Sequence, residues 1–405
     1  MIADTRARLV GRAGPISGTR GVAIAGIVLG VLAVWVTLPP WTVRDLAFPL
    51  ALGFLAVAAG IAAFARDERR LAAWAIGVGI LGAAGGLWLQ GVESETLDSI
   101  LTAGLVAATL RFATPLAFAA MGGIFSERSG VVNIGLEGMM LVGAFFAVWG
   151  SVWSGSWVVG LLMAMLFGGL LALIHAFFSI HLLADQIVSG FAVNLLALGV
   201  TGYLFTSIYP NGIPSGISRV PNVTLAFLDD IPVIGNFLYD VFGNLNLLVW
   251  LMLATVVLTY VVLFRTALGL RIRSVGEHPR AAETAGLSVY GLRYGCVVVS
   301  GILAALGGAF LSLGFVGGFA ENMTSGRGFI ALAAVIFGKW RPGLTFAATL
   351  LFGFGFALAI PLQREANVSA NLIATLPYFV TLIAVAGLIG RSIPPAADGR
   401  PYKKQ

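Results

Sequence analysis

The chain has 405 residues, of which 59% are hydrophobic and only 10% are charged. Soluble globular domains carry about 25% charged residues, so this composition excludes a soluble enzyme and also a disordered or fibrous protein. The sequence lacks the repeated alternating segments of about ten residues that form an outer-membrane barrel. Because one helical crossing takes about 20 apolar residues, the sequence predicts an all-α polytopic membrane protein with about 10–12 transmembrane helices.

Apolar runs mark the expected crossings in chain order. Three of them, at residues 21–38, 46–65 and 71–89, precede residue 100. The later runs lie at residues 100–125, 131–149, 157–180, 183–205, 247–264, 294–315, 344–360 and 372–389. Residues 329–337 are also apolar but too few to cross a bilayer alone. One or two broken or re-entrant helices are therefore expected, and residues 329–337 are predicted to form one of them. Such helices are tolerated where the backbone lines a cavity.

Two polar stretches predict loops on opposite sides of the membrane. Residues 209–245 are rich in Pro, Gly, Asn and Asp, which is typical of an external loop with a short helix or turn. Residues 265–293 carry five arginines, and basic residues stay on the cytoplasmic side. The distribution of the basic residues behind the net charge of +6 therefore predicts an orientation, with both termini in the cytoplasm. Membrane lipids are expected to surround the chain, and a nucleic-acid partner is not expected.

No catalytic motif survives inspection. A literal dinucleotide-binding pattern, G-x-G-x-x-G at residues 77–82, lies inside an apolar run, where small residues are better explained by helix packing. The histidines His175, His181 and His278 have no metal-ligand spacing with one another or with the single cysteine. The chain is therefore not expected to be an enzyme or to bind a metal or a cofactor, and a membrane-embedded enzyme lacks a visible nucleophile.

Polar residues at membrane depth are the strongest functional signal. An ionisable side chain there costs about 3 kcal/mol, so it should face a bundle interior or a water-filled path. Three clusters are predicted to line a substrate pathway: Glu127, Asn133 and Glu137; Asp185, Gln186, Ser189 and Asn194; Glu321 and Asn322. Asn133 and Glu137 are four apart, which predicts one helix face. The alternative for each residue is a structural polar contact, such as a Glu127–Arg128 salt bridge.

The cytoplasmic loop contains a readable helix signal. Pro279 is a helix start and Gly286 a helix stop, which predicts about two turns outside the membrane. A short helix with an alanine face and flanking arginines suits a groove on another protein, while a solvated connector is the alternative. The residues assigned to this coupling element are Glu277, Pro279, Arg280, Ala281, Ala282, Glu283 and Gly286.

Four segments together resemble bacterial ABC-importer permeases of the nucleoside and simple-sugar branch. They read FSERSGVVNIGLEGMM at residues 125–140, DQIVSGFAVN at 185–194, GLRIRSVGEHP at the start of 269–286, and GRGFIALA at 326–333. The resemblance implies a permease core at residues 100–392, with a coupling loop at 265–293. It leaves extra spans at residues 1–99 and a cytoplasmic tail at 393–405. Arg280 departs from the general pattern of a coupling helix, which opens with an acid.

The resemblance also implies an assembly in the bacterial inner membrane. Its parts are a cytoplasmic ATP-binding subunit, a second homologous permease subunit and an extracytoplasmic substrate-binding lipoprotein. ATP is used by the partner. The function predicted is that of a permease subunit that imports nucleosides or related small polar solutes. The rival is a proton- or sodium-coupled secondary transporter, in which Glu127, Glu137, Asp185 and Glu321 carry the coupling ion.

Overall fold

The computed structural model describes residues 18–35, 47–65, 69–91, 102–232, 234–365 and 392–403. The span predicted at residues 372–389 lies outside the described residues. Eight described helices are long and apolar enough to cross a membrane, and the described strands have three residues each. The prediction of an all-helical, multi-pass membrane protein is confirmed. The chain separates into two compact units, Met1–Gly104 and Leu105–Gln405.

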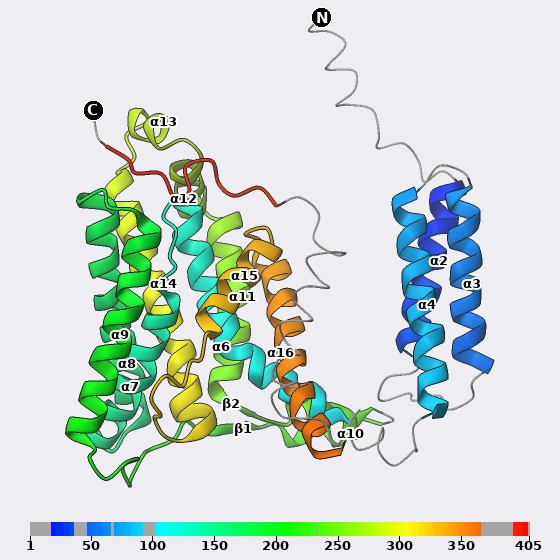
Figure 1. Cartoon of the computed structure of the whole chain (residues 1–405), viewed down its shortest axis with the longest axis horizontal. Coiled ribbons are helices and arrows are strands. Elements are labelled where there is room, and N and C mark those ends of the chain that lie inside the picture. The colour runs from blue at the N-terminus through cyan, green and yellow to red at the C-terminus, as the bar shows by residue number, and fades with distance from the viewer. Residues whose placement is uncertain are drawn as a thin grey trace, which may run out of the picture. The chain divides into compact units, whose positions relative to one another are not determined.

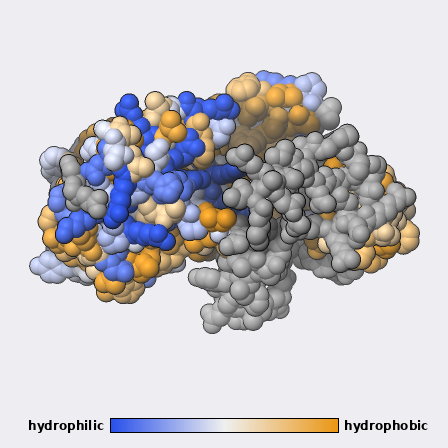
Figure 2. Space-filling view, turned by 90° about the horizontal axis from the view of Figure 1, so that it is seen from above, coloured by the Kyte–Doolittle hydropathy of each residue, from blue (hydrophilic) through white to orange (hydrophobic). Residues whose placement is uncertain are grey.

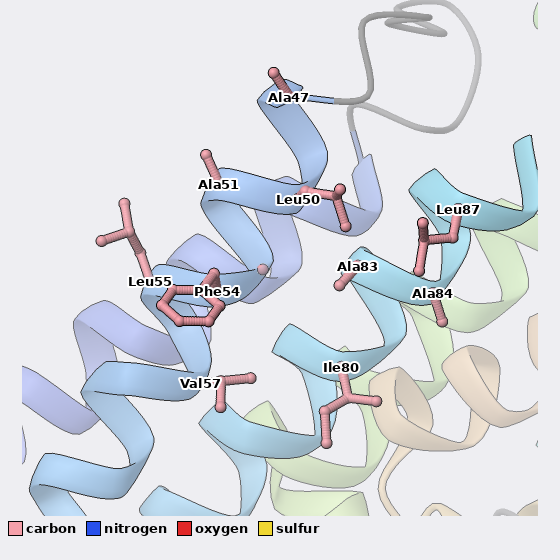
Figure 3. Close-up of a pocket in the computed structure, with 11 residues that line it drawn as sticks. Ala47, Leu50, Ala51, Phe54, Leu55, Val57, Ile80, Ala83, Ala84 and Leu87 are labelled. Carbon is pink, nitrogen blue, oxygen red and sulfur yellow. The ribbon is translucent and has the colours of Figure 1, made fainter. Parts of the chain in front are cut away.

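The described part of the first unit contains three helices packed through small residues. These are α2 (Gly18–Trp35), α3 (Ala47–Phe64) and α4 (Arg69–Gly91). The glycine pattern of residues 77–82 lies within α4, where a methyl group on Gly79 would press on the backbone oxygen of Gly53 in α3. The pattern therefore serves close helix packing, as the sequence predicts. An apolar groove of about 820 Å³ runs between α3 and α4, lined by residues such as Phe54, Ile80 and Leu87 (Figure 3). The described residues that line it are all apolar.

The second unit is the helical core. Its first part comprises α6 (Ala103–Arg128), α7 (Leu136–Ser154), α8 (Trp157–Ala176), the π-helical turn η1 (Phe177–His181), α9 (Gln186–Ile208), β1 (Asn222–Thr224), η2 (Ala226–Leu228), α10 (Gly235–Phe242) and β2 (Asn244–Asn246). Its second part comprises α11 (Leu247–Arg265), α12 (Ala267–Glu277), α13 (Pro279–Thr284), α14 (Val289–Ala309), the π-helical turn η3 (Phe310–Val316), α15 (Arg327–Phe337) and α16 (Pro342–Glu365).

The two ends of the core differ in structure (Figure 1). At one end lie α12, α13 and the C-terminal segment. At the other, β1 and β2 form an antiparallel pair with Val223 opposite Leu245, and α10 lies next to them. The predicted external loop at residues 209–245 thus contains the expected short helix and also a small β-ladder that the sequence did not indicate.

Two boundaries differ from the predictions. The span predicted from residue 131 begins only at Leu136, and residues 131–133 have no regular structure. Asn133 therefore does not share a helix face with Glu137, because hydropathy cannot distinguish an apolar extended link from an apolar helix. The polar loop predicted at residues 265–293 contains α12, whose amphipathic pattern sets it apart from the apolar spans.

Close backbone contact between α7 and α14 holds the centre of the core. A methyl group on Gly308 of α14 would overlap the carbonyl oxygen of Met140 in α7, and one on Gly143 would overlap the backbone of Ala305. In a membrane the hydrophobic effect does not drive helices together, so packing of this kind supplies the stability.

Gly308→Ala should therefore unfold the core more easily, since either helix must shift to admit the methyl group. We expect a loss of at least about 2 kcal/mol, the range of overpacked cores. Gly199→Ala in α9 is the matched control, because nothing lies within 4 Å of its added carbon. Thermal unfolding of the purified variants in detergent measures the difference, and equal melting temperatures would contradict the packing argument.

Candidate functional site

The short helix α15 begins inside the core, and Glu137 binds its N-terminal end. Helix α15 has 11 residues, so it is about 16 Å long and does not cross a membrane. Its first amides are paired by Glu137 in the first turn of α7. The two carboxylate oxygens accept hydrogen bonds from Gly326 N at 2.7 Å and Gly328 N at 2.6 Å. The negative charge stabilises the positive end of α15 and satisfies its unpaired donors.

The extended link before α7 is held by amide side chains of α9. The Oε1 atom of Gln186 accepts a hydrogen bond from Val132 N at 2.8 Å. Asn194 binds on both sides of the helix start, because its Oδ1 accepts from Gly138 N at 2.8 Å and its Nδ2 donates to Ile134 O at 3.0 Å. These bonds replace the backbone bonds that a non-helical link in a membrane would otherwise lack.

Two residues that were not among the predicted pathway residues join this set of polar contacts, which we call the polar centre. His175, at the end of α8, lies 3.0 Å from Ser189 Oγ through Nδ1 and 3.1 Å from Val132 O through Nε2. Ser300 of α14 accepts a hydrogen bond from Asn133 Nδ2 at 2.9 Å. Their partners lie on other segments of the chain, so no spacing in the sequence reveals either pairing.

Some polar atoms of this centre have no partner among the described residues. They are Asn133 Oδ1, Gln186 Nε2 and Thr324 Oγ1, all buried. A buried polar atom without a hydrogen bond is costly, which makes these three atoms the leading candidates for contact with a polar solute.

The structure brings five of the predicted pathway residues into this network: Asn133, Glu137, Gln186, Ser189 and Asn194. The other four are placed elsewhere. Asp185 is exposed and caps α9, accepting hydrogen bonds from Ile187 N and Val188 N. Glu321 and Asn322 are exposed in the turns before α15.

Glu127 lies at the end of α6 and engages Trp340 rather than its neighbour. Its carboxylate accepts a hydrogen bond from the indole N–H of Trp340. Arg128 donates to the carbonyl oxygen of the same tryptophan from Nε at 3.2 Å and Nη2 at 3.1 Å. This arrangement joins the end of α6 to the turn between α15 and α16.

The predicted coupling helix is present as α13. It begins at Pro279, and the chain turns away at Gly286, whose φ of +82° suits glycine. Ala282 is its one buried residue and packs against Val275 and Val289. The rest of the helix is accessible or half-buried, with Arg280, Ala281 and Thr284 exposed.

Helix α12 connects α13 to the end of α6. A methyl group on Gly276 would overlap the carbonyl oxygen of Arg128, so α12 touches the end of α6 directly. Figure 2 looks onto this end of the core and shows hydrophilic residues gathered across it. Exposed basic residues here are Arg271, Arg280, Arg400 and Lys403. A protruding helix on a charged surface offers a docking site, connected to helices that reach the polar centre.

Comparison with known proteins identifies the family. The family model described as the permease component of the branched-chain amino acid transport system matches residues 105–386. This is more than half of the chain and begins at the core unit. The chain therefore belongs to this permease family, and its role is that of an ABC transporter permease in a membrane.

Three relatives are similar to the chain over nearly their whole length. The guanosine ABC transporter permease protein NupQ of Bacillus subtilis is 43% identical, covering 74% of this chain and 96% of NupQ. The nucleoside ABC transporter permease protein NupC of Lactococcus lactis is 38% identical, with the same coverage. A putative glucose ABC transporter permease protein of Haloferax volcanii is 33% identical, covering 72% and 93%. No solved structure matches the chain.

Glu137→Ala should destabilise the core because it leaves two amides at the α15 terminus without an acceptor. Each unsatisfied buried donor costs about 1–3 kcal/mol, so we expect at least about 2 kcal/mol in total. Glu137→Gln, which keeps one carbonyl acceptor, should fall between the alanine variant and the wild type. Thermal unfolding in detergent tests this, with Glu321→Ala as the exposed-carboxylate control. If the two alanine variants melted together, Glu137 would not be holding α15.

Proposed function

We propose that this member of the permease family imports nucleosides or related small polar solutes, with ATP hydrolysed on a separate subunit. The carrying observation is the α13 helix, which stands exposed on the charged end of the core while α12 connects it to α6. The solute class is supported by the two relatives that are named as guanosine and nucleoside permeases.

Membership of the ABC permease family implies an ATPase partner and a substrate-binding partner in general. The specific assembly proposed here has a cytoplasmic ATP-binding subunit that receives α13, a second homologous permease subunit and an extracytoplasmic binding lipoprotein. No cofactor is bound by this chain in that assembly. The end that carries α12 and α13 is the cytoplasmic one, because its exposed basic residues follow the positive-inside rule. Both termini lie on that side.

A mechanism follows from the contacts between the two sites. Closure of the ATPase displaces α13, and α12 passes the displacement to the end of α6 through the contact of Gly276 with Arg128 O. The end of α6 is tied to the turn after α15 by Trp340. Since the start of α15 is bound to α7 by Glu137, movement at the cytoplasmic end reaches the polar centre as a shift of α15 against α7.

Solute recognition in the polar centre would be transient. Asn133 Oδ1 accepts hydrogen bonds, Gln186 Nε2 donates them and Thr324 Oγ1 does both. This set suits a solute with hydroxyl groups and ring nitrogens. A few neutral hydrogen bonds give a weak site, which lets the solute leave on the other side.

The ion-coupled alternative is not favoured. Both oxygens of Glu137 are already bound to backbone amides, and the comparisons are with ABC permeases. Uptake of a labelled purine nucleoside into cells with an uncoupler and constant ATP separates the two. Continued uptake supports the proposal, and collapse would favour the ion-coupled transporter.

Ala281→Trp should abolish nucleoside uptake, because Ala281 is exposed on α13. The variant chain should also no longer bind the ATPase. The effect comes from a steric block at the docking surface. Ala282 is a poorer test site, since it is buried and a bulky residue there would displace the helix itself. Co-purification of the ATPase with the tagged chain, together with uptake, measures both effects.

Ser215→Trp, exposed at the opposite end of the core, is the matched control for ATPase binding and should leave co-purification of the ATPase unchanged. Normal uptake by the Ala281→Trp protein would exclude α13 as the docking helix.

A further inference from the structure

The C-terminal segment Ser392–Lys403, here called the strap, crosses the cytoplasmic end of the core (Figure 1). It binds the end of α12 at two points. Ala397 N donates to Gly276 O at 2.9 Å, and Ala396 N donates to a carboxylate oxygen of Glu277 at 3.2 Å. The strap is thus bound to the helix that immediately precedes the docking helix.

Tyr402 fixes the strap to α13 itself. Its ring is buried and packs in the same cluster as Ala282, the one buried residue of α13. Its hydroxyl donates a hydrogen bond to the carboxylate of Glu283 on α13. On the other side, Tyr290 donates to the carbonyl oxygen of Tyr402 at 3.4 Å. The seat of α13 is therefore built partly by the strap.

A buried arginine ties the strap to the transmembrane helices. Arg293, near the start of α14, is 1% exposed. Its Nε donates to Ser129 O at 3.2 Å, just after α6, and its Nη1 donates to Arg400 O in the strap at 3.3 Å. Burial raises the pKa of the nearby Asp398 carboxyl to about 7, and the positive charge of Arg293 opposes this shift only in part.

The strap and α13 enclose a groove of about 520 Å³ between them. Basic residues from both walls line it, with Arg280 on α13 and Arg400 and Lys403 on the strap, all exposed. Glu277 is the acid in the lining, and its carboxylate is already bound to Ala396 N. The groove therefore presents positive charge from two separate segments of the chain.

We propose that the strap and α13 form one docking groove, which binds an acidic segment of the ATPase subunit. The proposal rests on the proposed function, because any protein that covers the exposed face of α13 also lies over the adjoining groove. Complementary charge favours an acidic segment as the occupant. The strap then gives the ATPase a second contact with the core besides α12. Arg293 of α14 connects this contact to the end of α6, because it donates to both Arg400 O and Ser129 O.

The test is a charge reversal on the strap wall, Arg400→Glu with Lys403→Glu. Neither side chain carries the bonds that hold the strap, since Arg400 contributes only its carbonyl oxygen to Arg293. We expect ATPase retention on the tagged chain in nanodiscs to fall about tenfold at physiological ionic strength, a change of about 1.4 kcal/mol. Arg271→Glu, an exposed arginine of α12 outside the groove lining, should change retention less than twofold.

Several outcomes separate the claims. If the double variant retained the ATPase like wild type while Ala281→Trp lost it, the groove proposal would be wrong and the proposed function would stand. If wild type retained no ATPase, the proposed function itself would fail. An equal loss in Arg271→Glu, or a loss present in anionic and absent in neutral-lipid nanodiscs, would assign the charges to lipid headgroups and overturn the proposal. Unchanged melting temperatures exclude misfolding as the cause of lost binding.

Discussion

The structure depends on how a membrane protein satisfies backbone that is not helical. Helix α15 begins inside the core, and the link before α7 is extended there. Each would leave unpaired amides or carbonyls at a depth where water is not present to bind them. Glu137 and Asn194 solve the problem together, one at the start of α15 and the other around the start of α7. The polar residues of the centre are therefore first of all structural.

A structural role does not remove these residues from transport. Because Glu137 is the tie between α7 and α15, any rocking of one helix against the other must stretch or preserve its two hydrogen bonds. Asn133 and Thr324, on the segments that precede α7 and α15, have buried polar atoms left unpaired among the described residues. The polar centre thus combines a fixed contact between α7 and α15 with unused hydrogen-bonding capacity, which agrees with the proposed solute pathway.

The crossings could be predicted because the bilayer demands long apolar helices, and this demand is local in sequence. The runs predicted at residues 157–180 and 247–264 correspond closely to α8 with η1 and to α11. The start of α7 could not be predicted from hydropathy, since residues 131–136 are apolar whether helical or extended. The pair His175–Ser189 joins two helices and the pair Asn133–Ser300 joins the extended link to α14, so only the packed structure reveals them.

The strap shows a further limit of reading a sequence locally. Residues 393–405 look like a short basic tail, yet Tyr402 is buried beside Ala282 and Arg400 O binds the buried Arg293. Helix α13 has six residues and buries one side chain of its own, so its own packing fixes little of its position. Its position must come from its surroundings, which include the buried ring of Tyr402 in the strap. The end of the chain therefore belongs to the same mechanical unit as the helix that precedes it by more than a hundred residues.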